Sequence, residues 1–529
     1  MDRSKGVLMK LTDKINPMDF EEKIDLFEEK TKEFYDGKLS QKEYKGFSGK
    51  YGSYAQRGAK ANMLRLRMNG GRLTKKKLKY ILDKTAEHDV PLLHFTTCQT
   101  VQMHDLSPET TVEIMRDALK AGIVCYGGGG DYPRNVMCSP LTGTEKEEYF
   151  DVMPYALAAS EFLIHFIDRE KMPRKLKVAF SNSKSNVSHA TIRDLGFVAK
   201  ENGLFDVYGA GGMGANPRLG VKVAEDVDPS KILYYIYAMI ETFKKYGNYD
   251  NRAKARTRYM VESLGGEDNF RKAYLEELEK VMAENDIDLT DVEEVVIDKQ
   301  PSDTLLEESW FVLPQKQDGL YTVRWHPIGG SPDKEVLKKV YEAILPMDQV
   351  EIRLSPDETA YIINLNGDEA LKIQDIIKDD AARTPLEASS SCIGASICQV
   401  GIRDSQSLLK KIVEAVREAD IDAKALPQIH ISGCPSSCSA HQTAELGFRG
   451  FVKVVDKKPH ASFMMFAYGD EVQGQERLGR EMGNILEEKV PALVVELGKT
   501  VQDSGMNFKE WLKANPEKLD ELAAKYAAD

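Results

Sequence analysis

The sequence has no apolar run long enough to cross a membrane. None of its 529 residues belongs to a stretch of 18 apolar residues, and the first five, Met1-Asp-Arg-Ser-Lys, lack the apolar core of a signal peptide. Disulfides suit secreted chains, and nothing in this sequence indicates secretion. We therefore expect a cytoplasmic protein with free thiols and no membrane segment.

A nicotinamide- or flavin-binding motif is also missing. Gly127 to Gly130 form a glycine run, but no strand-GxGxxG-helix context surrounds it, so we interpret it as a tight loop. The formal net charge of −12 argues against general nucleic-acid binding, although it does not exclude a local basic patch. An apolar content of 42% is ordinary for a globular protein, and the length predicts several domains or fused repeats.

Four of the seven cysteines form two close pairs. Five residues separate Cys392 from Cys398 and three separate Cys434 from Cys438, unlike the CxxC pairs of zinc sites. A helical apolar pattern capped by Ser405 and a short strand, residues 427–431, lie between the pairs, which places both pairs on loops. Thiolates grouped in this way predict a soft metal centre. The alternatives are unrelated core cysteines or disulfides.

The chain also contains an internal duplication. In the first half we expect a strand over 63–68, a helix over 74–82 and a strand over 92–106, and the same order recurs at 321–325, 336–345 and 350–365. Four residues recur 259 positions later: Arg65 as Arg324, Gly70 as Gly329, Thr100 as Thr359 and Leu106 as Leu365. Residues 178–197 match residues 429–448 at an offset of 251, where Ser183 and Val187 replace the second cysteine pair. Only the second half can therefore hold the metal centre.

The two cysteine pairs, with Gly433 and Pro435 beside them, resemble the cluster motif of the sirohaem-dependent nitrite and sulfite reductases. The resemblance covers roughly residues 50 to 500. It implies an internally duplicated α/β (α+β) fold, with two ferredoxin-like half-domains and two α/β domains that bind sirohaem and a [4Fe-4S] cluster. It also implies that four thiolates hold the cluster and that the Cys438 thiolate bridges to the sirohaem iron. The implied ligands are Cys392, Cys398, Cys434 and Cys438.

On this resemblance we divide the chain into six segments. They are an N-terminal helical cap (1–50), the first ferredoxin-like half-domain (51–122), the first sirohaem-binding domain on the anion side (123–245), a helical linker (246–315), the second ferredoxin-like half-domain (316–380), and the second sirohaem and [4Fe-4S] domain with C-terminal helices (381–529).

The resemblance places an anion site in the first half. Arg134, Lys175 and Lys177 match residues that bind the substrate anion, and a period of two puts both lysines on one face of a strand. Without the cysteine motif, solvated lysines would be the preferred interpretation. The residues implied to lie against the cofactor, beside Cys438, are Arg65, Arg67, Cys98, Gln99 and Gln102.

Cys98 departs from the family pattern, which usually has arginine at this position. Cysteine removes a fixed charge and a bidentate anion ligand. Either Arg65, Arg67 or another cation replaces it, or the chain prefers a less charged substrate.

The implied activity is the six-electron reduction of nitrite to ammonium, with electrons from a separate ferredoxin-like protein. The alternative on the same scaffold is assimilatory reduction of sulfite to sulfide. The lysine pair favours sulfite, whereas the missing arginine favours nitrite. A non-catalytic iron–sulfur electron carrier or redox sensor is a third possibility. We expect a monomer, a small inorganic anion as substrate, and a possible donor-docking patch at Lys75, Lys76 and Lys77.

Overall fold

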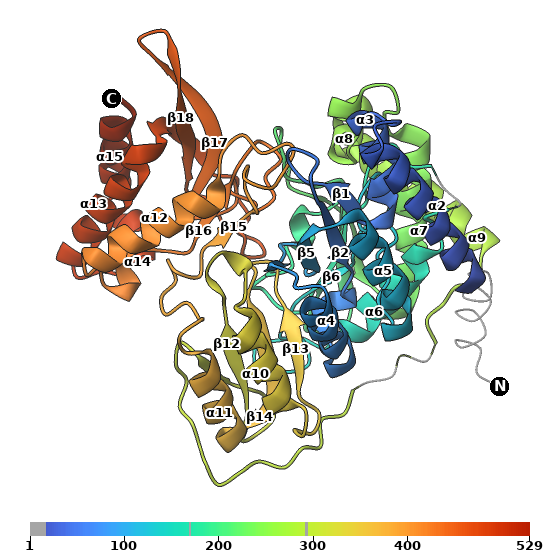
Figure 1. Cartoon of the computed structure of the whole chain (residues 1–529), viewed down its shortest axis with the longest axis horizontal. Coiled ribbons are helices and arrows are strands. Elements are labelled where there is room, and N and C mark those ends of the chain that lie inside the picture. The colour runs from blue at the N-terminus through green and yellow to red at the C-terminus, as the bar shows by residue number, and fades with distance from the viewer. Residues whose placement is uncertain (1–16, 169–170, 291, 293–294, 529) are drawn as a thin grey trace.

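The computed structural model describes residues 17–168, 171–290, 292 and 295–528 (Figure 1). The first 16 residues of the expected N-terminal cap lie outside the described residues. The rest of that segment begins with helices α2 (Pro17–Tyr35) and α3 (Gln41–Ser48). Ser40 and Glu43 cap α3 through a reciprocal pair of side-chain-to-backbone bonds. None of the described helices is long and apolar enough to cross a membrane.

The first ferredoxin-like sheet is antiparallel and has the strand order β1-β2-β5-β4. Its elements are β1 Ser53–Ala55, β2 Asn62–Leu66, α4 Lys75–Glu87, β4 Leu92–Phe95, β5 Val101–Leu106 and α5 Pro108–Ala118. The prediction of one strand over 92–106 is wrong, because the chain turns at residues 96–100. Gln99 adopts a φ of 53°, and the Thr96 hydroxyl accepts hydrogen bonds from the amides of Cys98 and Thr100. The turn brings Cys98 to the end of the sheet.

The second ferredoxin-like sheet repeats this design. Its elements are β11 Val312–Pro314, β12 Leu320–Trp325, α10 Lys334–Ile344, β13 Glu351–Leu354, β14 Ala360–Asn366 and α11 Gly367–Ile377. The expected strand over 350–365 is again a hairpin, with Glu358 at a φ of 73° in the position that Gln99 holds in the first half. The hydrophobic repeat alone did not show either turn, because both turns are flanked by residues that suit strands.

A strand from the first half completes the second sheet. The sheet order is β11-β12-β14-β13-β3, and β3 (Arg72–Leu73) pairs with β13. Arg72 Nη2 lies 2.8 Å from Glu351 Oε2 across this junction. The two sheets share one hydrophobic core, in which Phe95 packs edge-on against Trp325. The two ferredoxin-like sheets are therefore one packed unit.

The two remaining sheets have matching orders, β10-β9-β8-β7-β6 and β15-β16-β17-β18-β19. In each, the first three strands in sequence are parallel and the others antiparallel. The first sheet contains β6 Met137–Cys138, β7 Val178–Ser181, β8 Leu195–Ala199, β9 Phe205–Gly209 and β10 Val221–Val227. The second contains β15 Ser390–Ser391, β16 Ile429–Ser432, β17 Leu446–Val455, β18 Lys458–Ala467 and β19 Arg480–Leu486.

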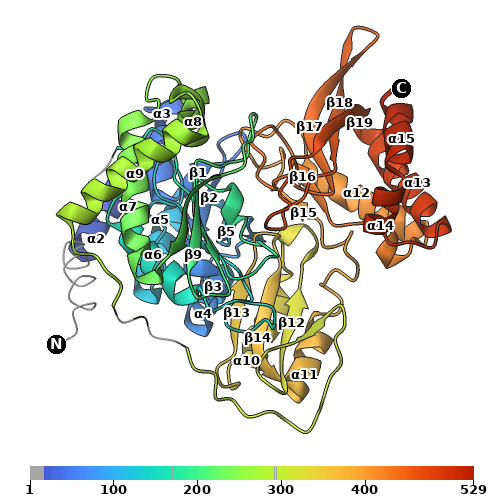
Figure 2. The ribbon, with the colours of Figure 1, turned by 180° about the vertical axis from the view of Figure 1, so that it is seen from behind.

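Each of these sheets has its own hydrophobic core and helices. The helices of the first are α6 Met153–Ile164, α7 Ile232–Tyr246, α8 Arg258–Ser263 and α9 Glu267–Glu284. Those of the second are α12 Ser405–Glu418, α13 Val490–Asp503, α14 Phe508–Ala514 and α15 Pro516–Ala528. Figure 2 shows the second domain, in orange and red, beside the first domain and above the yellow half-domain.

The duplication extends to unusual backbone positions. Asn186 and Ser437, 251 residues apart, have φ of 51° and 52°, and His189 and Ala440 have φ of 57° and 52°. Non-glycine residues rarely adopt such angles, so their recurrence at one offset reflects a shared loop shape. At Gly196 in β8 a Cβ would lie 1.8 Å from the Ala190 oxygen, and at Gly447 in β17 it would lie 2.1 Å from the His441 oxygen. Both loops therefore cross directly over a glycine of the next strand.

The connection between the two halves is helical only at its start. The prediction of a helical linker over 246–315 is wrong beyond α9, because the described residues between Glu284 and Val312 contain neither helix nor strand. Side-chain contacts hold this segment instead: Lys299 Nζ lies 2.5 Å from Glu369 Oε2, and the Trp310 indole donates to the Ala382 carbonyl at 2.7 Å. The segment wraps the second half-domain (Figure 1).

Candidate functional site

The four predicted cluster cysteines come from two loops of the last domain. Cys392 directly follows β15, and Cys434 follows β16 after one glycine. Helix α12 begins at Ser405 after an Asp404 cap, whereas we had expected Ser405 itself to cap it. The Ser405 hydroxyl is thereby free to bond Cys392, whose carbonyl and sulfur it approaches at 2.7 and 3.2 Å. The parallel pairing of β15 with β16 brings the two loops to the same sheet edge.

The four thiols interact with one another electrostatically. Burial raises the pKa of Cys438 to about 12, and the charges of Cys392, Cys434 and Cys398 add to this effect, although Cys438 keeps an exposed surface. Among the described residues, three donor atoms mutually within 4.8 Å occur only at the exposed group Glu87, His88 and Glu113. No three of the four sulfurs therefore lie mutually within 4.8 Å, whereas a single tetrahedral zinc with bonds of about 2.3 Å needs ligand atoms roughly 3.8 Å apart.

Such a spacing fits a larger cluster of iron and sulfide. The Cys392 sulfur accepts a hydrogen bond from the Gly433 amide at 3.2 Å, and bonds of this kind stabilise cluster thiolates. All four sulfurs are free of disulfides. The donor set and its spacing therefore suit the [4Fe-4S] cluster that the resemblance implies.

The first half of the chain holds both cysteine loops in place. The Arg57 guanidinium donates to the carbonyls of Cys398 and Gly401 at 3.1 and 2.6 Å. The Thr97 hydroxyl donates to the Cys438 carbonyl at 2.9 Å. Since Thr97 precedes Cys98, the turn after β4 places the anion-side residues next to the Cys438 loop.

The predicted anion-site lysines lie in this same region. Burial lowers the pKa of Lys175 well below its usual range, and repulsion from Lys177, Arg256 and Arg134 adds to this, while Cys438 acts in the opposite direction. Lys175 donates no hydrogen bond to the described residues. Lys175, the three other cations and Cys438 thus interact electrostatically, and the Lys175 side chain is available to a ligand.

Cys98 forms an ion pair with the second lysine. Lys177 Nζ lies 3.2 Å from the Cys98 sulfur. Burial would raise the pKa of the Cys98 thiol, but Lys177, Arg193 and Arg65 together lower it to about 6. At neutral pH this position therefore carries a negative charge, where the family usually has a positive one.

The predicted arginines bind protein carbonyls. Arg65 Nη1 donates to Gly128 O at 2.5 Å, and Arg134 donates to the carbonyls of Gly128 and Gly130 at 2.7 Å each. Arg67 is 2% exposed, and it donates to the carbonyls of Tyr126, Pro133 and Arg134 at 3.1 to 3.2 Å. The expectation that Arg67 shares a face with Arg65 for cofactor binding is not supported by these contacts. Arg67 instead fixes the glycine loop at 127–130.

The predicted glutamines also have partners within the protein. The fully buried Gln99 amide donates to the carbonyls of Cys138 and Leu354 at 2.7 and 2.6 Å. The Gln102 amide, with its oxygen turned toward Arg65, accepts from Arg65 Nη2 at 2.6 Å. Gln99 therefore joins the two halves, and Gln102 positions Arg65.

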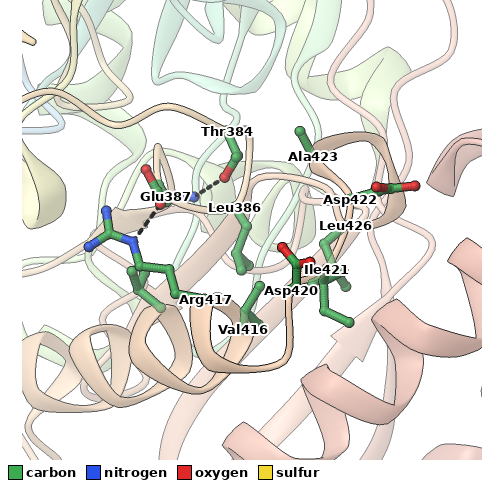
Figure 3. A pocket seen from close by; sticks show the side chains of 11 residues that line it. Thr384, Leu386, Glu387, Val416, Arg417, Asp420, Ile421, Asp422, Ala423 and Leu426 are labelled. Carbon is green, nitrogen blue, oxygen red and sulfur yellow. Dashed lines mark hydrogen bonds and ion pairs between the residues drawn. The ribbon is translucent and has the colours of Figure 1, made fainter.

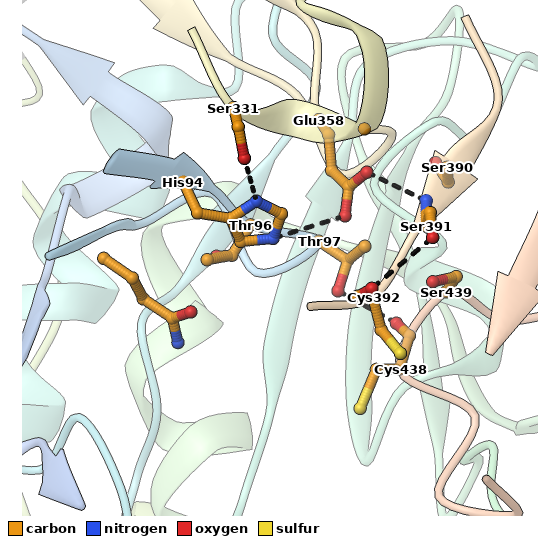
Figure 4. Close-up of polar contacts among 12 residues, drawn as sticks. His94, Thr96, Thr97, Ser331, Glu358, Ser390, Ser391, Cys392, Cys438 and Ser439 are labelled. Carbon is orange, nitrogen blue, oxygen red and sulfur yellow. Dashed lines mark hydrogen bonds and ion pairs between the residues drawn. The ribbon is translucent and has the colours of Figure 1, made fainter. Parts of the chain in front are cut away.

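Sequence reasoning missed a buried acid at the counterpart of Gln99. Glu358 is 0% exposed, accepts from the Ser391 amide at 3.0 Å, and lies 3.7 Å from the His94 ring nitrogen (Figure 4). Burial raises the pKa of Glu358 well above its usual range and lowers that of His94 to about 4, so burial favours the neutral form of each group. Figure 4 shows these contacts continuing from Glu358 through Ser391 to the Cys392 carbonyl. The 259-residue offset between Gln99 and Glu358 was a signal that could have identified it.

The surface hollows of the last domain lie elsewhere. A hollow of about 200 Å³ beside α12 is lined by both apolar and polar residues, among them Glu387, which accepts from Arg417 at 2.7 Å (Figure 3). A neighbouring hollow of about 570 Å³ shares Thr384, Glu387 and Arg417. Neither hollow is lined by a cysteine or by a predicted anion-site cation.

The expected donor patch on α4 is reduced to a single exposed lysine. Lys75 Nζ is turned toward the carbonyls of Leu345 and Met347, and Lys77 is half-buried. Only Lys76 of the three is exposed.

Comparison with known proteins agrees with this architecture. Residues 54–121 match the nitrite/sulfite reductase ferredoxin-like half domain, and residues 129–282 match the nitrite and sulphite reductase 4Fe-4S domain. Sulfite reductase [ferredoxin] 1 of Mycolicibacterium paratuberculosis is 26% identical over 74% of this chain and 70% of that protein. Chloroplastic ferredoxin–nitrite reductase of Spinacia oleracea is 25% identical over 81% of this chain and 72% of that protein.

A solved structure shows the same fold. The Mycobacterium tuberculosis NirA protein superposes with a TM-score of 0.75 at 22% identity, covering 96% of this chain and 95% of that one. The domain matches, the duplicated fold and the paired cysteines agree with one another. Residues 54–121 and 129–282 of the chain are thus similar to nitrite and sulfite reductase domains, and the chain shares the fold of NirA.

Proposed function

We propose that the chain reduces nitrite to ammonium, consuming six electrons and eight protons and releasing two waters. The observation that carries this proposal is the convergence of Lys175, Lys177 and Cys438 in one region. A protein that only carries electrons through a cluster has no need for cations beside Cys438, the exposed thiol among the four. An anion-reducing enzyme does need them.

The residues that would hold the cluster are the four cysteines, and Cys438 is the one that the resemblance also assigns to the haem. When bound, the [4Fe-4S] cluster and sirohaem supply single electrons to the anion. The Ser405 hydroxyl and the Gly433 amide support the Cys392 thiolate. Thr97 fixes the Cys438 loop through its carbonyl.

The cations of the first half bind and orient the anion. Lys175 and Lys177 neutralise its charge and stabilise the negative charge that develops as bonds to oxygen break. Because burial and repulsion lower the pKa of Lys175, its proton is easily given up, so it is suited to pass a proton to a departing oxygen. Arg134 stays fixed on Gly128 and Gly130, and its charge acts on Lys175 from there.

Sulfite is the second candidate substrate, because the two lysines resemble the pattern of sulfite-reducing enzymes. The Cys98–Lys177 pair favours nitrite, since the thiolate cancels one positive charge and a monoanion needs less compensation than a dianion. Among the similar proteins both activities occur by name.

We further propose that a ferredoxin donates the electrons, as the names of both relatives indicate for those proteins. A monomeric state, a cytoplasmic location and the boundaries of the six segments are part of the same proposal, with the linker helical only as far as α9.

The test is a spectrum together with turnover. Purified protein should show cluster absorption and the Soret and alpha bands of sirohaem, with about four non-haem irons per chain. Turnover of nitrite and of sulfite should then be measured with a chemical reductant, which bypasses donor docking. A higher kcat/KM for sulfite would reverse the substrate assignment. Cluster absorption without haem bands would refute the reductase proposal.

A further inference from the structure

The missing arginine at position 98 leaves the question of which cation replaces it. Arg65 and Arg134 are hydrogen-bonded to the glycine loop and Arg67 is buried on three carbonyls. The remaining arginine that acts on the Cys98 sulfur is Arg193, which follows the loop before β8. The carboxylate of Asp194, the next residue, accepts a hydrogen bond from the Lys177 backbone amide at 2.8 Å, so Arg193 lies beside the lysine that bonds Cys98.

Arg193 is a buried cation whose strongest electrostatic partner is Cys98. It is 9% exposed. Burial lowers its pKa, and Cys98, followed by Glu471 and Asp194, counteracts this. Arg193 in turn acts on Lys177, so it lies within the same group of charges as the predicted anion site.

A histidine and a carboxylate orient this arginine. Arg193 Nη2 donates to His189 Nδ1 at 3.0 Å, and Arg193 Nε points to the Ser188 carbonyl at 3.4 Å. Because an arginine can only donate, His189 Nδ1 must be unprotonated, and its proton lies on Nε2. Nε2 lies 2.8 Å from Glu471 Oε2, so the carboxylate fixes both the ring and its tautomer.

Glu471 belongs to the other half of the chain, in the loop between β18 and β19. Thr443 donates to its carboxylate, and Asn186 donates to its backbone carbonyl at 2.9 Å. The backbone N–H of Gln473 also donates to the Lys184 carbonyl at 2.9 Å. At the equivalent positions of the second half, 251 residues on, the chain has Ala440 and Ala444 instead of His189 and Arg193. The arrangement is therefore specific to the anion side.

We propose that Arg193 supplies the anion-binding cation that Cys98 lacks, and that His189 and Glu471 are positioning residues that aim it at the Cys98–Lys177 pair. The proposal rests on the proposed function and extends it by naming the substrate-binding cation. Arginine offers a planar fork of donors, which suits an oxyanion such as nitrite or sulfite.

The test measures nitrite binding to the oxidised holoenzyme by visible-spectrum titration, separately from turnover. Arg193→Gln should weaken binding roughly tenfold to a hundredfold, as expected for loss of a charged hydrogen bond. KM for nitrite should rise by a larger factor than kcat falls. Arg193→Lys should retain part of the affinity, while His189→Gln and Glu471→Gln should give smaller losses. Arg480→Gln, at a surface pair with Asp520, is the matched control and should bind like the parent.

Rescue separates anion binding from a structural role. In the Arg193→Gln background, Cys98→Arg should restore most of the affinity, because it returns a guanidinium to the position from which the family usually supplies it. If Arg193→Gln is too unstable to purify, Glu471→Gln carries the same test of orientation, with the same rescue.

Two outcomes overturn the proposal. The proposal is contradicted if the Arg193→Gln variant binds nitrite as tightly as the parent. It is also contradicted if the double variant Arg193→Gln, Cys98→Arg binds nitrite as weakly as Arg193→Gln alone. In both cases the parent would still show haem bands and turnover, so the reductase proposal would stand. A parent that binds neither nitrite nor sulfite would remove both proposals together.

Discussion

The loops before β8 and before β17 are two versions of one backbone. Both contain left-handed residues at equivalent positions, Asn186 with Ser437 and His189 with Ala440, and both cross a glycine of the following strand. Their chemistry differs completely. The second loop carries Cys434 and Cys438, whereas the first has Ser183 and Val187 at those positions. Duplication has thus preserved the loop shape, while one copy carries the cysteines proposed to bind metal and the other lies on the proposed anion side.

The largest effect should come from removing the Cys438 thiol, which we propose as a ligand of both the cluster and the sirohaem. Cys438→Ser should abolish turnover and strip iron, because no neighbouring group can replace a ligand proposed to serve two metals. Iron and sirohaem content of the purified variant provide the measurement.

Cys125→Ser and Cys138→Ser are the matched controls. Both cysteines are buried core thiols with pKa raised by burial, to about 12 for Cys125 and well above the usual range for Cys138. Iron content should match the parent in each. A control variant that loses the cluster as fully as Cys438→Ser would show that the ligands are wrongly assigned.

On the anion side, Lys175→Ala should reduce nitrite turnover about 10²- to 10³-fold, because a partly dry site loses a preorganised charge. Haem content should stay at the parental level. Turnover in the parent should decline as pH rises through the lowered pKa of Lys175, since the neutral amine no longer attracts the anion. Lys177→Ala should behave similarly. Loss of haem in proportion to activity would instead place these lysines in cofactor retention.

Cys98→Arg makes the first half more like the rest of the family. The change replaces a thiolate by a guanidinium and should shift relative kcat/KM toward sulfite by roughly tenfold or more. Both substrates should be assayed with the same chemical reductant. An unchanged ratio would mean that the Cys98 side chain does not face the anion.

The smallest effect is expected at the two hairpin turns that contain Gln99 and Glu358. Glu358→Gln gives the second half the amide that Gln99 provides in the first. Because burial raises the folded-state pKa of Glu358, ionisation of the unfolded chain reduces parental stability as pH rises above about 4.5, by up to about 1.4 kcal/mol per pH unit. The variant has no such proton. Its melting temperature should therefore fall less between pH 5 and pH 7 than that of the parent, and equal changes would contradict a neutral Glu358.

Much of the fold could be predicted because the internal duplication is detectable as constant offsets between matching residues. The offsets of 259 and 251 located equivalent strands, and the cysteine spacing located the cluster loops. The hairpin turns at Gln99 and Glu358 could not be predicted, since a left-handed φ at a glutamine or glutamate has no local signal. The irregular segment after α9 was mistaken for helix because its charged composition also suits helices.

The predicted site was less complete than the fold. Lys175 and Lys177 were predicted because each matches a family position, and Cys98 was noticed because it departs from the family pattern. Arg193, His189 and Glu471 come together only through tertiary contacts between halves, and no spacing in the sequence connects them. Arg67 and Gln99 were expected at the cofactor, yet they bind backbone carbonyls, a role that residue type alone does not indicate.

The pairing of β3 with β13 also affects how the chain is made. Arg72 and its partner Glu351 are 279 residues apart. At a synthesis rate of about 5 to 20 residues per second, β3 leaves the ribosome roughly 15 to 55 s before the strand it must join. During that interval the nascent first half exposes an unpaired strand, which is a template for wrong pairing. The molecule therefore has a long window of vulnerability to aggregation during translation, and we expect its yield in cells to depend on chaperones that bind the first half before the second emerges.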